Sequence, residues 1–399
     1  MNVSGIKNDC VLCGACEAIC PHSCISVNRH LELDDEKCTD CSLCYEICPA
    51  VHSLWNLGGI ADSSRHYDAD IGSYCSTGFA APEEKKYLSE GTSAGMTRAF
   101  LNHALECGVI DATVVVETQG FKPAVKNEVN GSIARSVYLR LPLLKVLGEL
   151  DEKKKYAVVA LPCQLQALDN MQRRGYYTNV ILKVGLFCGM NMQHDVVDDI
   201  KSVLRLKESN IKNFDFRGGK HPGGLHIETK SGKIHAYSKH LYKFLNLLYL
   251  PRRCFYCNDF MSEFSDISFG DAWNEYLYRY DEHARWNSVV CRSEKAKQLF
   301  EKGVSKGKFK FVSARPEDLK QLFGFNIAFK KKWLAMRILA ANKKYLYRDF
   351  QSGKLGMVKQ IFYLPVYCAM SVLRTVAARR FFKLLYPAIF SLFSTRPRK

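Results

Sequence analysis

Two copies of one cysteine pattern dominate the start of the chain. CVLCGACEAICP begins at Cys10 and CTDCSLCYEICP begins at Cys38, and both spell C-x2-C-x2-C-x3-C-P. The opening residues, MNVSGIKNDC, lack the basic and apolar regions of a secretory signal. We therefore expect a cytoplasmic protein with reduced thiols, and clustered reduced thiols favour metal binding over disulfides.

The spacing within each copy favours a [4Fe–4S] cluster over zinc. Structural zinc sites usually combine two C-x2-C pairs across a longer loop. The present run is that of two-cluster bacterial ferredoxins, in which the fourth cysteine ligates the other cluster. The expected ligands of one cluster are Cys10, Cys13, Cys16 and Cys48, and those of the other are Cys38, Cys41, Cys44 and Cys20. A pair of zinc knuckles is the alternative, and Cys24 is expected to be a packed free thiol.

From residue 92 the pattern changes to apolar strands that alternate with helices. The stretch TSAGMTRAFLNHALECG has helical spacing, with Thr92 or Ser93 as the expected cap and Gly108 as the expected end. Alternation of strands with helices predicts an α/β body built on a parallel sheet. The expected strands are residues 111–117, 153–162 and 179–188.

Four further cysteines form a candidate third metal site. Cys163 and Cys188 lie at the carboxyl ends of consecutive predicted strands, where open α/β sheets bind their ligands. Cys254 and Cys257 supply one more C-x2-C pair. Two alternatives stay open at this point, because either rim cysteine can serve core packing and the pair alone can be half of a zinc site.

A small-residue loop, EGTSAGMT (residues 90–97), leads into the first predicted helix of the body. Free backbone amides and the helix dipole favour an anion at such a position, for example the pyrophosphate of a nucleotide. Taken alone, this feature is common, since many helices begin with Ser, Thr and Gly.

Together these motifs resemble the coenzyme F420 hydrogenase/dehydrogenase beta subunits, with a ferredoxin-type domain in front. The matching segments, EGTSAGMTRAFLNHALECGVIDATVVV, ALPCQLQAL, KVGLFCGMN and CFYCNDFMSEFSDISFGDAW, occur in the order of the family. The resemblance implies an FAD-binding body with a [4Fe–4S] cluster of its own. By resemblance, the ligands of that cluster are Cys163, Cys188, Cys254 and Cys257. The implied FAD-binding residues are Thr92, Ser93, Ala94, Gly95, Thr97, Gln164, Ser268, Gly270 and Asp271.

One departure from the family pattern concerns the phosphate loop. The family usually has two glycines after the serine, whereas this chain has Ser93, Ala94 and Gly95. The resemblance implies an oxidoreductase that passes electrons between a substrate at FAD, coenzyme F420 or another, and the iron–sulfur clusters. The alternative is a flavin-free electron-transfer protein that serves a partner enzyme. No proton donor is assigned. His221, in a glycine-rich loop, is the best polar candidate, with a surface turn histidine as the alternative. Arg217 and Lys220 nearby are candidates to meet an anionic substrate, with solvated surface charges as the alternative.

Charge divides the chain into three expected parts. The formal charge is +17, but residues 1–60 carry three Lys/Arg against eight Asp/Glu, and residues 330–399 carry sixteen Lys/Arg against one Asp. This uneven spread argues against a general nucleic-acid binder. We expect a ferredoxin-type domain (residues 1–60), an oxidoreductase body (61–329) and a basic amphipathic helical tail (330–399).

The tail has three open interpretations. Basic charge among Phe, Leu and Tyr suits a helix on an anionic membrane surface, but docking of a redox partner protein and ordinary packing on the body are alternatives. The longest uncharged run, residues 360–373, is too short to span a bilayer. Pro365 and Pro387 are expected to break the tail into segments.

Overall fold

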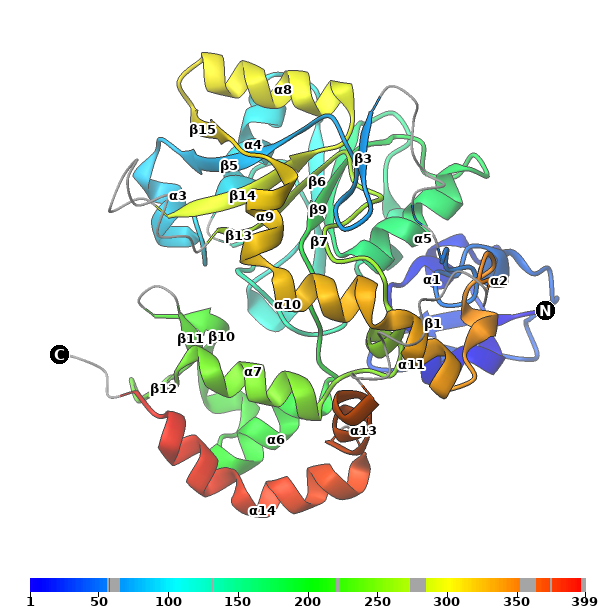
Figure 1. The fold of residues 1–399 in the computed structure, drawn as a ribbon, viewed down its shortest axis with the longest axis vertical. Coiled ribbons are helices and arrows are strands. Elements are labelled where there is room, and N and C mark those ends of the chain that lie inside the picture. The colour runs from blue at the N-terminus through cyan, green and yellow to red at the C-terminus, as the bar shows by residue number, and fades with distance from the viewer. Residues whose placement is uncertain are drawn as a thin grey trace.

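The structure is a computed structural model of the 399-residue chain. It describes residues 1–55, 57, 65–130, 132–219, 223–272, 285–351, 364–373 and 375–395. Figure 1 shows a sheet body, the cysteine-rich N-terminal unit beside it, and a smaller lobe with the C-terminal helices.

The cysteine-rich unit consists of short elements. Each cysteine run passes through a left-handed residue, Gly14 or Ser42, directly before a short helix, and a hairpin separates the runs. Five of the eleven buried residues in its own core are cysteines, so sulfur replaces much of the apolar core that so small a unit lacks. The elements are η1 (Val3–Asp9), α1 (Ala15–Ile19), β1 (Ile25–Val27), β2 (Leu31–Leu33) and α2 (Leu43–Glu46).

The body contains an eight-stranded sheet in the order β15-β5-β14-β13-β9-β8-β6-β7. Its centre, β6-β8-β9-β13, is parallel, which confirms the predicted strands and the α/β class. The prediction of a parallel sheet needs correction at the flanks, where β14, β5 and β15 on one side and β7 on the other pair in antiparallel fashion. The link from β6 to β7 is too short for the crossover that parallel neighbours require. The strands are β5 (Ser76–Pro82), β6 (Ala112–Val116), β7 (Pro123–Lys126), β8 (Tyr156–Ala160), β9 (Val180–Leu186), β13 (Ile267–Ala272), β14 (Trp286–Cys291) and β15 (Phe309–Ser313).

Helices cover both faces of this sheet. On β6, Val115 packs in the cluster that includes α4 and α8, whereas Val114 packs in the cluster that includes α5 and η4. Continuous apolar runs without polar alternation are therefore buried on both faces, as expected for central parallel strands. The covering elements are α3 (Lys85–Glu90), α4 (Met96–Glu106), η4 (Leu143–Glu149), α5 (Pro162–Gln172) and α8 (Glu294–Ser305), and a hairpin of β3 (His66–Asp68) and β4 (Gly72–Tyr74) lies before the sheet.

The first helix of the body begins later than predicted. Its N-cap is Gly95, with φ +89°, and α4 starts at Met96. The prediction of a cap at Thr92 or Ser93 is wrong, because the Ser93 hydroxyl donates to the Trp286 carbonyl oxygen instead. The left-handed turn at Gly95 separates the loop from the helix, and only glycine adopts it readily.

A second lobe is inserted between the parallel strands β9 and β13. It contains an antiparallel sheet in the order β10-β11-β12 and the helices α6 and α7. Figure 1 shows α14 along the outer side of this lobe. The elements are α6 (Asp195–Leu204), β10 (Ile211–Gly218), β11 (Gly224–Thr229), β12 (Ile234–Ala236), α7 (Lys239–Leu248), α13 (Leu364–Leu373) and α14 (Val376–Phe393).

After β15 the chain crosses from the sheet to the cysteine-rich unit. Figure 1 shows this path through α9, α10 and α11. Lys343, just beyond α11, pairs with the buried Asp9 of the N-terminal unit at 3.0 Å. The elements of the crossing are α9 (Pro316–Leu322), α10 (Gly324–Ile327), η8 (Ala328–Lys332) and α11 (Leu334–Ala340).

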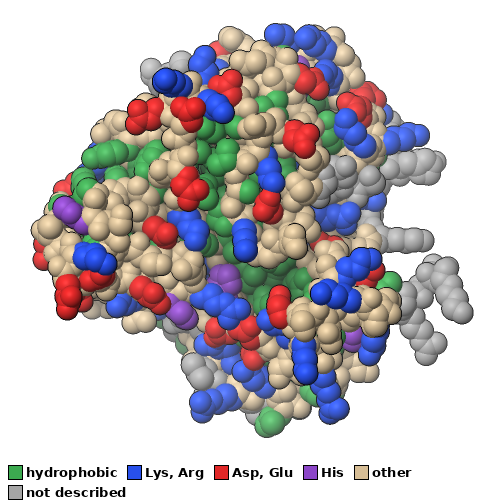
Figure 2. Space-filling view, turned by 180° about the vertical axis from the view of Figure 1, so that it is seen from behind, with side chains coloured by type: hydrophobic (Ala, Val, Ile, Leu, Met, Phe, Trp, Pro, Cys, Tyr) green, Lys and Arg blue, Asp and Glu red, His purple; other side chains and the backbone are tan. Residues whose placement is uncertain are grey.

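The helix α14, the longest described helix of the tail, packs on the second lobe. Tyr386 and Phe390 are buried against the lobe, and the Tyr386 and Tyr249 hydroxyls lie 2.7 Å apart. Lys383 pairs with Asp199 of α6 at 2.7 Å, so part of the basic charge meets acidic partners. On the face seen in Figure 2, Lys and Arg side chains lie among Asp and Glu side chains.

Pro387 does not end a helix, which corrects the expected break. It lies inside α14, although a proline there removes one backbone hydrogen bond. Packing of Tyr386 and Phe390 on the lobe holds the helix on both sides of the proline. Among the described residues, no helix is both long and apolar enough to cross a membrane.

The packing of α14 predicts different effects on the free energy of unfolding for two of its side chains. Phe390→Ala is expected to lower the free energy of unfolding by about 3 kcal/mol, because it empties a buried aromatic site. Leu392→Ala removes a side chain that is 77% exposed and is expected to change it by less than about 0.5 kcal/mol. Urea unfolding of both variants measures the difference, and equal effects would show that α14 does not pack on the lobe in solution.

Candidate functional site

Four cysteines from three segments meet at the carboxyl ends of the parallel strands. Cys163 lies in the first turn of α5, directly after β8, and Cys188 follows β9. Cys254 and Cys257 lie in and just after η6 (Arg253–Tyr256). The Cys163 thiol lies within electrostatic range of the other three, and Cys188 lies within range of Cys254 and Cys257. The structure therefore gathers the four residues of the candidate third metal site, which we call the body set.

Burial and mutual repulsion favour the protonated form of these thiols. Burial raises the pKa of Cys163 well above its usual value, and the charges of its three partners raise it further. Burial also raises the pKa of Cys188 to about 12, although the Lys330 ammonium opposes this shift. Buried thiols of this kind ionise when metal cations stand among them. The donor set therefore fits an iron–sulfur cluster.

The N-terminal cysteines form two further groups, and each takes three thiols from one run and one from the other. The first set lines one small cavity and consists of Cys10, Cys13, Cys16 and Cys48. The second set lines another and consists of Cys20, Cys38, Cys41 and Cys44. Burial raises the pKa of Cys48 to about 12. The structure thus brings together the exchanged groups that the spacing of the runs predicts.

Cys24 lies closer to the second set than expected for a separate thiol. Its sulfur is 3.3 Å from that of Cys20, and it lines the same cavity. Burial raises its pKa to about 12. Across the described parts of the chain, no three His, Cys, Asp or Glu side chains are arranged to hold a single metal ion.

The three sets follow one another in space. Cys13 of the first set belongs to the hydrophobic cluster against which Cys163 of the body set packs, and its charge acts on Cys163. Cys16 of the first set and Cys44 of the second lie together in the core of the N-terminal unit. The first set therefore lies between the other two.

Close backbone contact fixes the first cysteine loop on the body. The Leu144 amide donates to the Cys13 carbonyl oxygen at 2.9 Å. Gly14 has φ +85°, and a Cβ there would lie 2.7 Å from the Lys145 nitrogen and 2.9 Å from the Pro142 carbonyl oxygen. Only glycine permits this approach.

Three cations stand among the sulfurs, and sequence reasoning missed all of them. Arg140 donates to the Cys10 carbonyl oxygen at 2.7 Å, and its charge acts on Cys10 and Cys254. Arg253 is buried and donates to the Pro49 carbonyl oxygen and the Ser53 hydroxyl. Burial lowers the pKa of Lys330, but the charges of Cys257, Cys188 and Cys254 outweigh this and raise it. Periodicity and spacing give no signal for these residues, since Lys330 stands in a KKK run that reads as a solvated surface.

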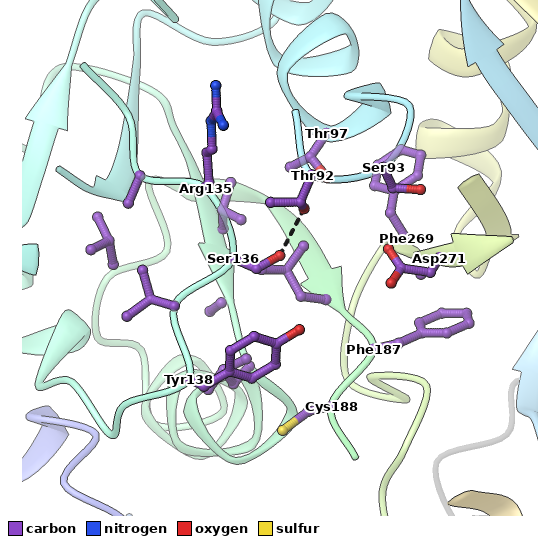
Figure 3. Close-up of a pocket in the computed structure, with 18 of the residues that line it drawn as sticks. Thr92, Ser93, Thr97, Arg135, Ser136, Tyr138, Phe187, Cys188, Phe269 and Asp271 are labelled. Carbon is purple, nitrogen blue, oxygen red and sulfur yellow. Dashed lines mark hydrogen bonds between the residues drawn. The ribbon is translucent and has the colours of Figure 1, made fainter. Parts of the chain in front are cut away.

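A cavity of about 380 Å³ opens at the carboxyl ends of the central strands, directly beside the body set. A volume of this size is typical of small-molecule sites. Cys188 belongs both to the cavity lining and to the body set. Figure 3 shows Thr92 facing Ser136 across a hydrogen bond of 2.8 Å, with Cys188 in the same cavity.

Most of the residues implied for FAD line this cavity. They are Thr92, Ser93, Gly95, Thr97, Gln164, Gly270 and Asp271. Ala94 instead packs in a hydrophobic cluster with Phe79 and Ile327, so its methyl group points into the core. Ser268 is fully buried on β13 and is not among the lining residues. The Gln164 amide donates to the Leu141 carbonyl oxygen and accepts from the Leu161 amide, so it also positions the cavity wall.

An ion pair between a buried arginine and a partly exposed aspartate joins the lobe to the cavity. Arg217, whose side chain is 2% exposed, pairs with Asp271 at 2.7 Å and donates to the Thr92 carbonyl oxygen. Beside it the Tyr138 and Tyr242 rings stack at 4.9 Å. Arg217 is therefore a fixed wall residue rather than the solvated charge that is usual near a surface turn. The other polar candidates, Lys220 and His221, lie outside the described residues.

Comparisons with known proteins agree with this geometry. Residues 153–317, which include the whole body set, match the family described as the C terminus of the coenzyme F420 hydrogenase/dehydrogenase beta subunit. One of the subunits of the F(420)H(2) dehydrogenase of Methanosarcina mazei is 26% identical over 74% of this chain and 83% of its own length. The coenzyme F420-dependent sulfite reductase of Methanocaldococcus jannaschii is 25% identical over 73% of this chain but only 45% of its own length.

A solved structure supports the fold. A chain of the F420-reducing [NiFe] hydrogenase complex from Methanosarcina barkeri superposes with a TM-score of 0.53 and 24% identity, over 69% of this chain and 96% of that one. Fold and relatives define the class, an α/β oxidoreductase with a cysteine-rich N-terminus. Residues 153–317 carry the C-terminal region of the coenzyme F420 hydrogenase/dehydrogenase beta subunit family, and the curated relatives extend this similarity over most of the chain.

The contact at Gly14 generates a prediction. Gly14→Ala is expected to lower the free energy of unfolding by more than about 1 kcal/mol, because it combines a positive φ with a backbone clash. Gly5→Ala is the matched control, since a Cβ there meets nothing within 4 Å. Anaerobic urea unfolding compares the two, and an unchanged midpoint for Gly14→Ala would mean that the loop does not rest on η4.

Proposed function

We propose that this protein is an iron–sulfur flavoprotein oxidoreductase. It passes electrons between a hydride donor or acceptor at FAD and three [4Fe–4S] clusters, with coenzyme F420 or another reducible molecule as substrate. The relatives named for coenzyme F420 support this choice of substrate class. The observation that carries the proposal is the double place of Cys188, which lines the cavity and belongs to the body set.

The order of the thiol sets supports a path through the protein. The cavity adjoins the body set at Cys188, the body set adjoins the first set at Cys13, and the first set adjoins the second at Cys44. Neighbouring sets are thus close enough for their charges to interact. The protein holds the three sets in this spatial order through the backbone contact between the N-terminal unit and the body.

The cavity residues are suited to hold FAD. When bound, FAD exchanges a hydride with a substrate and gives or takes electrons singly, as iron–sulfur clusters require. The loop before α4 would hold its phosphates, because Thr97 and the helix N-terminus face the cavity. The amide of Met96 already donates to Asn287 Oδ1, so the donors proposed for a phosphate are Thr97 and the Thr92 hydroxyl, which also hydrogen-bonds Ser136.

The outer end of the path offers a place for a redox partner protein. Cys41 of the second set is exposed, whereas Cys16 of the first set is buried. The surrounding residues 32–40 carry five acidic groups against Lys37, so a partner with a basic surface would be attracted there. Peripheral membrane contact of the tail stays a prediction, with Leu384 and Leu392 exposed on α14.

Metal content tests the number of clusters. Anaerobic reconstitution is expected to give about twelve iron per chain, and Cys163→Ser is expected to lower this to about eight because one of three cubanes is lost. Cys368→Ser, which removes an exposed cysteine outside all three sets, is the control and is expected to keep about twelve. About eight iron in the unchanged protein would contradict a cluster at the body set, and bound zinc without iron would contradict all three.

Flavin content tests the cavity separately. Thr97→Trp puts an indole into the cavity and is expected to reduce bound flavin at least tenfold while iron content stays the same. Glu106→Trp, at the exposed end of the same helix, is expected to retain flavin. The ratio of flavin to iron in anaerobic preparations measures both. Clusters without flavin in the unchanged protein would favour the flavin-free electron-transfer protein.

A further inference from the structure

Lys330 is a lysine buried without a carboxylate. It lies in η8 and is 1% exposed. In the described part of the chain, no Asp or Glu pairs with it, whereas its neighbours do find such partners. Lys331 binds Glu263, and Lys332 lies 3.9 Å from Asp70. Lys331 and Lys332 are thus directed to carboxylates, whereas the Lys330 side chain is directed into the protein interior.

The buried Lys330 lies beside the segment that carries Cys254 and Cys257. η8 packs on η6, because the Phe329 and Phe255 rings lie 6.0 Å apart and Arg337 donates to the carbonyl oxygens of both residues. Burial lowers the pKa of Lys330, but the charges of Cys257, Cys188 and Cys254 raise it, which agrees with this placement. Arg253 and Arg140 approach the same set, but each also donates to carbonyl oxygens at the junction with the N-terminal unit.

Neutral thiols do not offset a buried ammonium. Taking an unpaired charge out of water is costly, and a thiol is a weak hydrogen-bond partner. Four thiolates around an iron–sulfur cluster carry the negative charge that would balance Lys330. A reduction then adds one electron, and no proton, to a group that is already anionic, so a nearby cation favours the reduced form.

We propose that Lys330 is the counter-charge of the cluster at the body set and raises its reduction potential. The inference rests on the proposed function, because it requires a cluster held by Cys163, Cys188, Cys254 and Cys257. Lys330 acts through the cluster and is not among the residues that line the cavity. It is a positioning residue that sets how readily the innermost cluster accepts an electron.

The test is an EPR-monitored redox titration of the full-length, reconstituted protein. The signal of the body-set cluster is the one that Cys163→Ser removes. Lys330→Met is expected to lower its equilibrium constant for reduction at least tenfold, which is 59 mV for a one-electron couple, and to leave the other two signals unchanged. Lys330→Arg is expected to restore most of the shift, and Lys332→Met, which removes a largely exposed charge two residues away, is expected to cause none.

Three results separate the inference from the function beneath it. A body-set signal with an unchanged midpoint in Lys330→Met would overturn the inference and leave the proposed function intact. Absence of that signal from the unchanged protein would overturn the function itself. If Lys330→Met yields no folded protein, Lys330→Gln is titrated in its place. Iron-free protein adds a second readout, since Lys330→Met is expected to raise its melting temperature by removing a buried, unbalanced charge.

Discussion

The contact between the first cysteine loop and the body determines the spatial order of the three thiol sets. The loop meets η4 through backbone atoms, at Gly14 and at the Cys13 carbonyl oxygen, so little freedom is left at the junction. Cys13 consequently stands beside Cys163, and the first set becomes the middle of three. Without this contact the N-terminal unit would be a separate ferredoxin-like module instead of a continuation of the site in the sheet.

Charge explains why the junction contains so many cations. The three sets concentrate buried sulfur, and thiolates in such numbers repel each other. Arg140 and Arg253 stand where the N-terminal unit meets the body, while Lys330 comes from the helical crossing after β15. Segments far apart in the sequence thus supply positive charge to one place. The same residues that would stabilise bound clusters leave the cluster-free protein with unbalanced buried charge.

The features that the sequence predicts best are those determined by local residue patterns. The cysteine groups follow from spacing, and the central strands follow from continuous apolar runs. The antiparallel flanks were missed because β5, β14 and β15 pair over long sequence separations. Helix α4 begins at Met96 because Gly95 turns left-handed, and Pro387 lies within α14 because its neighbours pack on the lobe. Lys330 has no local signal, since only tertiary structure turns it inward.

Diffraction data collected above and below the iron absorption edge, from crystals grown without oxygen, would locate the metal directly. We predict three separate iron peaks, one within each thiol set, with the first set's peak between the other two and the body set's peak next to the cavity. A missing peak between Cys163, Cys188, Cys254 and Cys257, or a zinc signal in any of the sets, would contradict the proposed path.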